Sequence, residues 1–162
     1  MKMYAAMFGL SLAISACTQT GTVKLRGDST RQDADSLAIA GTETLCFERY
    51  SGNRNQDTAS IRLVLKGNNV SGSYANIPYE KDARIGTISG TRSGNVMKGI
   101  WRFQQEGMSD SVGFEWKIED DMLLQKQTGF DSSSGREVLS DTAAFSQEYL
   151  RVDCQSLNSR IR

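Results

Sequence analysis

Carboxylates in two loops are the side chains of this sequence that could act as general acids or bases. Glu80 and Asp82 lie in the segment after Pro78, and Glu106 follows the apolar stretch that contains Trp101. Two facing carboxylates could hydrolyse a glycosidic bond, but nothing in their spacing fixes a separation, and solvated loop carboxylates are the simpler interpretation. We assign no catalytic residue and treat these three acids and Trp101 as residues that could contact a ligand or partner.

The sequence contains no histidine. This excludes Ser-His-Asp and Cys-His nucleophilic catalysis, zinc sites with imidazole ligands and imidazole-based acid/base chemistry. The acidic loops also lack the ligand spacing of an EF-hand. We therefore expect a protein that is not an enzyme and that has no cofactor and no resident metal.

The first 16 residues have the three-part layout of a secretory signal. Lys2 precedes an apolar run that ends at Ile14, and the small residues Ser15 and Ala16 follow. The run is too short to span a bilayer, which needs about 20 apolar residues. Residues 1–16 are therefore predicted to be a signal peptide that is removed.

The junction Ile14-Ser15-Ala16-Cys17 resembles the lipobox of bacterial lipoproteins. The resemblance implies cleavage before Cys17 and attachment of membrane lipid to its sulfur; an ordinary secretory signal that ends beside a cysteine is the alternative. Acyl chains would hold the protein to a membrane on the extracytoplasmic side of the cell envelope. Thr18 is not the aspartate that retains some lipoproteins in the inner membrane, so the outer membrane is favoured where there are two.

Lipidation of Cys17 leaves Cys46 and Cys154 as a pair separated by about 108 residues. In an oxidising, extracytoplasmic compartment a disulfide is the simplest interpretation, and two buried free thiols are the alternative. The spacing does not match the Cys-x-x-Cys pattern of redox-active pairs.

The charge balance argues against a nucleic-acid partner. The chain has 19 Lys+Arg and 19 Asp+Glu; the signal peptide removes one lysine, which leaves 18 basic against 19 acidic residues, a net charge of −1. A nucleic-acid-binding domain has a basic footprint. Residues 17–41 are polar and are predicted to form the lipidated N-terminus and a flexible tether, followed by a domain at 42–155 and a tail at 156–162.

From residue 42 onward, short alternating runs of apolar and polar residues predict about eight antiparallel strands in an all-β fold. Turn residues such as Gly67 and Gly94 predict tight hairpins. Glycines recur inside the runs, which favours a small closed barrel over a sandwich because glycines mark corners and close backbone approaches. The expected strands are Glu43–Tyr50, Ser60–Lys66, Val70–Asn76, Arg84–Thr91, Val96–Gln104, Ser111–Glu119, Met122–Gln127 and Phe145–Asp153, with a further short one near Glu137–Leu139.

Aromatic residues within these strands could line a ligand pocket or fill the barrel as its core. A filled barrel would favour a surface-binding or structural role, and an open lumen would favour a small ligand. The residues concerned are Phe47, Tyr50, Tyr74, Tyr79, Trp101, Phe103, Phe114 and Trp116.

The order of several short motifs resembles a group of uncharacterised small lipoproteins of Bacteroidota, with a calycin-like barrel as the implied fold. A more distant likeness is to lipid-anchored lysozyme inhibitors. The chain departs from the group in a Ser-rich stretch at Phe130–Leu139. The motifs are Gln56-Asp57-Thr58, Leu63–Gly72, Glu80-Lys81-Asp82, Gly86–Gly90, Trp101-Arg102-Phe103, Glu106-Gly107 and Val152-Asp153-Cys154.

We expect a non-enzymatic binding or inhibitor module of the cell envelope, whose partner is an envelope protein or a small ligand. Two alternatives remain open. One is a structural or stress-related envelope component without a small ligand. The other is a hydrolase that uses Glu80, Asp82 and Glu106.

Overall fold

The computed structural model describes residues 41–158 of the 162-residue chain. The predicted signal peptide, Cys17 and residues 18–40 of the predicted tether lie outside the described residues, as do residues 159–162 of the predicted tail. Between residues 41 and 158, no helix is long and apolar enough to cross a membrane.

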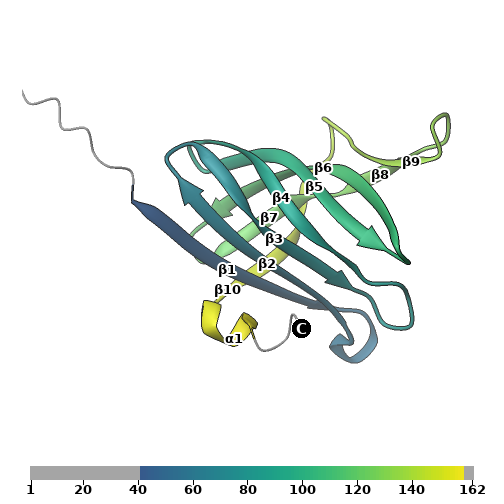
Figure 1. Cartoon of the computed structure of the whole chain (residues 1–162), viewed down its shortest axis with the longest axis horizontal. Helices are drawn as coiled ribbons and strands as arrows, with labels where there is room; N and C mark the ends of the chain where they lie inside the picture. The colour runs from purple at the N-terminus through teal and green to yellow at the C-terminus, as the bar shows by residue number, and fades with distance from the viewer. Residues whose placement is uncertain (1–40, 159–162) are drawn as a thin grey trace, which may run out of the picture. The chain divides into compact units, whose positions relative to one another are not determined.

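Eight antiparallel strands form a closed barrel (Figure 1). The first seven follow one another as a meander, and the last closes the barrel between the seventh and the first. The prediction of a small closed barrel rather than a sandwich is confirmed. The barrel strands are β1 (Thr42–Ser51), β2 (Asp57–Lys66), β3 (Asn69–Ile77), β4 (Arg84–Ser93), β5 (Val96–Gln105), β6 (Met108–Glu119), β7 (Met122–Lys126) and β10 (Phe145–Val152).

Alternate residues of each strand point into the barrel, as the two-residue period of a strand requires. The register places Leu45 of β1 beside Leu63 of β2, so the apolar sets of the two strands meet on the inner face. The inner side chains form one hydrophobic cluster, in which Trp116 and Tyr149 are completely buried. Each large apolar side chain buried in this way contributes about 1.5–3 kcal/mol, so the filled interior is the main source of stability.

Gly86 shows why glycine recurs in these strands. A Cβ atom at this position of β4 would overlap the backbone carbonyl oxygen of Arg102 on β5. The interpretation of the glycines as sites of close backbone approach is confirmed here. At Gly113 the nearest neighbour of the same atom would be the Leu139 side chain at 3.5 Å, which is an ordinary contact.

Two strands start three residues earlier than the sequence predicts. β2 begins at Asp57 because its pairing with β1 continues to Ser51, and β6 begins at Met108 because its pairing with β5 continues to Gln105. The extra residues of β6 are exposed and polar apart from Met108, so they lack the apolar alternation that marks a strand in sequence.

A separate two-stranded sheet interrupts the barrel between β7 and β10. It consists of β8 (Thr128–Asp131) and β9 (Arg136–Leu139), which pair only with each other. The expected short strand near Glu137–Leu139 is thus present as β9, while β8 was not anticipated.

The serines of the Ser-rich stretch lie in the turn of this hairpin. Asp131 accepts hydrogen bonds from the hydroxyl of Ser134 at 2.6 Å and the backbone N–H of Ser133 at 3.0 Å. These hydrogen bonds, that from the Ser134 hydroxyl first, lower the pKa of the Asp131 carboxyl to about 2. Gly135 completes the turn with a φ of 68° and donates its N–H to the Asp131 carbonyl at 2.8 Å.

Cys46 and Cys154 form a disulfide, with Cα atoms 5.2 Å apart, which confirms the predicted pairing. Cys154 is the first residue of the short helix α1 (Cys154–Asn158), so the bridge joins β1 to the segment that follows β10. Leu157 of this helix is completely buried. The predicted domain boundary at residue 155 therefore falls within a packed element.

The topology gives the barrel two different ends. The connections β1–β2, which includes the 3₁₀ helix η1 (Asn53–Asn55), β3–β4 and β5–β6 lie at one end together with the β8–β9 hairpin, and we call this the hairpin end. The N-terminal end contains the start of β1 at Thr42 and the turns at Gly67, Gly94 and Asp120. Figure 1 shows β8 and β9 away from the start of β1.

Candidate functional site

Aromatic rings occupy the interior of the barrel. Trp101 lies between Tyr74 and Phe103, with ring centroids 4.1 and 4.4 Å away. Its Nε1 donates a hydrogen bond to the Tyr74 carbonyl at 3.2 Å, and only 4% of the residue is exposed. The structure therefore places Trp101 in the core, where it supports the fold and does not reach a partner at the surface.

The other aromatic residues singled out from the sequence divide between core and surface. Tyr50 and Tyr79 are exposed at the hairpin end, whereas Phe47, Phe114 and Trp116 are buried with the rings above. The core interpretation therefore holds for most of the set, and an accessible ligand site has to be sought at the surface.

A cleft lies between the β8–β9 hairpin and the barrel. Its volume is about 400 Å³. Phe103 and Val112 of the barrel and Phe130 of the hairpin give it apolar surface, while Arg84 and Glu137 give it charge. Phe130 is 74% exposed, which is unusual for an aromatic ring in a strand. Asp110 and Arg136 also line the cleft, which therefore mixes apolar and charged surface in a volume within the range of small-molecule sites.

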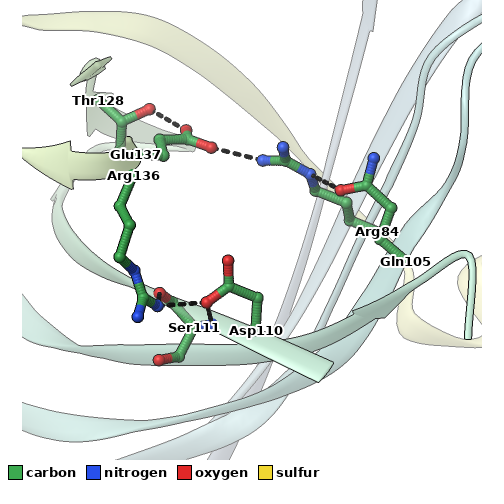
Figure 2. Close-up of polar contacts among 7 residues, drawn as sticks. All are labelled: Arg84, Gln105, Asp110, Ser111, Thr128, Arg136 and Glu137. Carbon is green, nitrogen blue, oxygen red and sulfur yellow. Dashed lines mark hydrogen bonds and ion pairs between the residues drawn. The ribbon is translucent and has the colours of Figure 1, made fainter. Parts of the chain in front are cut away.

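Arg84 connects the barrel to the hairpin across this cleft (Figure 2). Its Nη1 donates to Glu137 Oε2 at 2.5 Å, and its Nε donates to Gln105 Oε1 at 2.7 Å. The guanidinium also lies over the Phe103 ring, 5.0 Å from the centroid. The side chains of Arg84 and Glu137 are 30% and 35% exposed, so the pair is only partly screened by water.

Arg136 makes the second link between hairpin and barrel. It forms an ion pair with Asp110 of β6 and donates to the Ser111 carbonyl at 3.5 Å. Asp110 in turn accepts the Ser111 backbone N–H at 2.7 Å. Successive residues of a strand point to opposite faces, and Arg136 and Glu137 use this property to hold β9 to two different barrel strands (Figure 2).

A second depression, with a volume of about 640 Å³, adjoins the cleft on the outer face of β4, β5 and β6. Ile85, Arg102 and Gln104 are among its lining residues, and Arg136 and Phe103 line both depressions. Arg102 is exposed and donates to the Ser89 hydroxyl at 3.2 Å. The hairpin end thus offers a continuous hollow surface that carries three arginines.

The acids expected to contact a ligand lie around this surface, not in it. Glu80 and Asp82 are exposed in the β3–β4 connection, and Glu106 is exposed in the β5–β6 turn, so all three are at the hairpin end. Glu80 and Glu106 have positive φ values of 55° and 51°, which places both in turns. None of the three is among the residues that line the cleft or the outer depression.

The charged residues of the cleft were missed by sequence reasoning. Arg84 and Glu137 are 53 positions apart, and no motif links them. The available signal was indirect: the alternation fails after Gln127, and the aromatic Phe130 stands alone beside a run of serines. Those features mark a segment that is not part of the barrel wall.

Among residues 41–158, no group of three or more metal-ligating side chains is close enough together to hold an ion. Comparison with known proteins identifies no relative: no family model, curated protein or solved structure matches the chain. The resemblance to small lipoproteins of Bacteroidota therefore stays a prediction.

Proposed function

We propose that this protein is a lipid-anchored, non-enzymatic binding module of the cell envelope whose binding surface is the hairpin end. One observation carries the proposal. The interior of the barrel is filled by packed aromatic rings, whereas the hairpin end has an open cleft with an exposed phenylalanine and charged side chains from three elements. Binding at this end requires no opening of the core.

The direction of the chain supports this assignment. Cys17 precedes the barrel, and β1 begins at Thr42 at the N-terminal end. The described part of the chain therefore enters the barrel at the end opposite the cleft. The Cys46–Cys154 disulfide supports an oxidising, extracytoplasmic compartment, since disulfides are rare in the cytosol. The outer membrane is the proposed location in an envelope with two membranes.

A binding role accounts for the charged residues better than hydrolysis does. Asp110 and Glu137, the carboxylates beside the cleft, are each paired with an arginine. Such ion pairs fix the geometry of the carboxylates and stabilise their charged form, which suits a binding surface. The sequence also contains no histidine to act as a base. The proposed partner is an envelope protein or a small ligand, and the net charge disfavours nucleic acid.

Site-specific photocrosslinking in intact bacterial cells that express the protein tests which end binds. A photoreactive phenylalanine analogue is placed at Phe130 of the hairpin end and, as the matched control, at exposed Asn68 of the N-terminal end. We expect a discrete crosslinked species, or a mass increase from a bound small molecule, only at position 130. Equal crosslinking at the two positions would support a structural envelope component, and crosslinking only at 68 would contradict the proposal.

A further inference from the structure

We infer that Arg84 is the anion anchor of a ligand site in the cleft, and that the ligand is a carboxylate attached to an apolar body. In the structure Glu137 occupies the position that the ligand carboxylate would take on the Arg84 guanidinium. The inference rests on the proposed binding function and names the ligand class of the same site.

Arg84 is preorganised to bind a carboxylate. Gln105 holds its Nε at 2.7 Å, and the Phe103 ring supports the guanidinium plane from 5.0 Å. A guanidinium fixed in this way presents parallel N–H donors that match the two oxygens of a carboxylate. Because the side chain is 30% exposed, a ligand can approach it from the cleft.

Glu137 is an internal occupant that can leave. It belongs to the β8–β9 sheet, which has no strand pairing with the barrel. The hairpin remains attached through the Arg136–Asp110 ion pair and through Leu139, which lies beside Gly113. Rotation of the 35% exposed Glu137 side chain into solvent would therefore free Arg84 without unfolding the hairpin. It would also release the Thr128 hydroxyl, which now donates to Glu137, as a second donor for the ligand.

The walls of the cleft determine the rest of the ligand. Phe103, Val112 and Phe130 line the cleft together with Arg84, and most of the exposed apolar surface comes from Phe130. A small hydrophilic acid such as acetate would leave this surface uncovered, so the carboxylate must carry an apolar group. Two sources have this chemistry: a free aryl or alkyl acid, and the C-terminal carboxylate of a polypeptide that ends in an apolar residue.

Titration calorimetry on the purified lipidated protein tests the inference. The probes are 3-phenylpropionate and a hexapeptide that ends in phenylalanine with a free carboxylate. Their controls are 3-phenylpropanamide and the same peptide with an amidated C-terminus. We expect each binding acid to bind at least about tenfold more tightly than its amide, because charge-assisted hydrogen bonds are the stronger ones. Binding of the peptide alone would identify a polypeptide terminus as the source, and binding of phenylpropionate alone would identify a free acid.

Three variants separate this site from other arginines. Glu137→Gln removes the competing charge and should tighten acid binding about tenfold. Arg84→Gln should weaken it more than tenfold, while Arg151→Gln, at the exposed N-terminal end, should change it less than twofold. Because the Glu137→Gln result does not depend on Arg84→Gln being folded, the inference stays testable if that variant unfolds.

Equal binding of acids and amides, or weaker acid binding by Glu137→Gln, would overturn the inference. So would the absence of binding by all four probes to Glu137→Gln. If position 130 still crosslinks a partner in cells under those outcomes, the proposed function stands and only the ligand class is wrong.

Discussion

The phenolic oxygens of Tyr74 and Tyr149 lie 2.9 Å apart inside the barrel. Tyr149 donates its proton to Gln125 Oε1 at 2.8 Å, so Tyr74 must donate to Tyr149. Both hydroxyls are therefore protonated in the folded state. Burial raises the pKa of Tyr74, and burial together with the nearby Tyr74 hydroxyl raises the pKa of Tyr149 well above 10.

This hydrogen-bond chain predicts a loss of stability in alkali. Above the ordinary tyrosine pKa of 10.0 the unfolded chain releases protons that the folded barrel retains, so the free energy of unfolding falls as the pH rises. The loss should reach about 1 kcal/mol per tyrosine near pH 11. Urea unfolding between pH 8 and 11 measures it: Tyr149→Phe should flatten the decline, and Tyr79→Phe, at an exposed site, should not. Parallel curves for all three proteins would contradict this assignment.

Gly86 should not tolerate a methyl group. Gly86→Ala places a Cβ against the Arg102 carbonyl, so β4 and β5 have to separate, and we expect a loss of more than about 2 kcal/mol in unfolding free energy. Gly129→Ala is the matched control because nothing lies within 4 Å of its Cβ position. Thermal unfolding of the two variants decides the matter, and equal melting temperatures would show that the barrel has no such constraint at Gly86.

The barrel could be predicted because its information is local. Apolar and polar residues alternate within each barrel strand, which identifies the strand from its own sequence. The two cysteines can be paired without knowing the path of the chain between them. The cleft could not be predicted, because its central contact joins Arg84 to Glu137 over 53 positions through a hairpin whose strands are only four residues long. Trp101 was misleading for a related reason: alternation shows that a residue faces inward, but not whether the interior is hollow or filled.

Glu115 of β6 provides a test of buried electrostatics. Its carboxylate is 8% exposed and accepts ion-pair contacts from Lys126 at 3.1 Å and Lys98 at 3.2 Å. The lysine side chains differ in exposure, at 13% for Lys126 and 64% for Lys98. Burial opposes ionisation of Glu115, but the hydrogen bonds from the two lysines outweigh it and lower its pKa.

Lys126→Met should therefore destabilise the barrel by about 2–3 kcal/mol at pH 7, because the buried Glu115 carboxylate would then have only the exposed Lys98 as its partner. Lys98→Met should cost less than about 1 kcal/mol. Since a lowered folded-state pKa gives stability that is present above the ordinary value of 4.5 and lost below it, the penalty for Lys126→Met should shrink as the pH falls through that range. Urea unfolding at pH 7 and pH 3.5 measures the change, and a penalty independent of pH would point to packing instead.

The disulfide should be a large contributor to stability. It closes a loop with a sequence separation of 108 residues, and loops of this length predict up to about 4.7 kcal/mol from chain entropy. The double variant Cys46→Ala, Cys154→Ala should thus lose about 2–5 kcal/mol. Wild-type protein reduced in denaturant and refolded under reductant should show the same urea midpoint as that variant. A midpoint unchanged by reduction would show that packing of α1, and Leu157 in particular, holds β1 and the C-terminal segment together without the bond.

Lipidation is expected to depend on one sulfur atom. Cells that express the full chain and are labelled with radioactive palmitate should yield a labelled band, and Cys17→Ala should abolish it because the thioether to diacylglycerol forms only at that cysteine. Cys154→Ala is the informative control: it also removes a thiol but lies in the disulfide, so its label should persist. Retention of label by Cys17→Ala would contradict the lipobox.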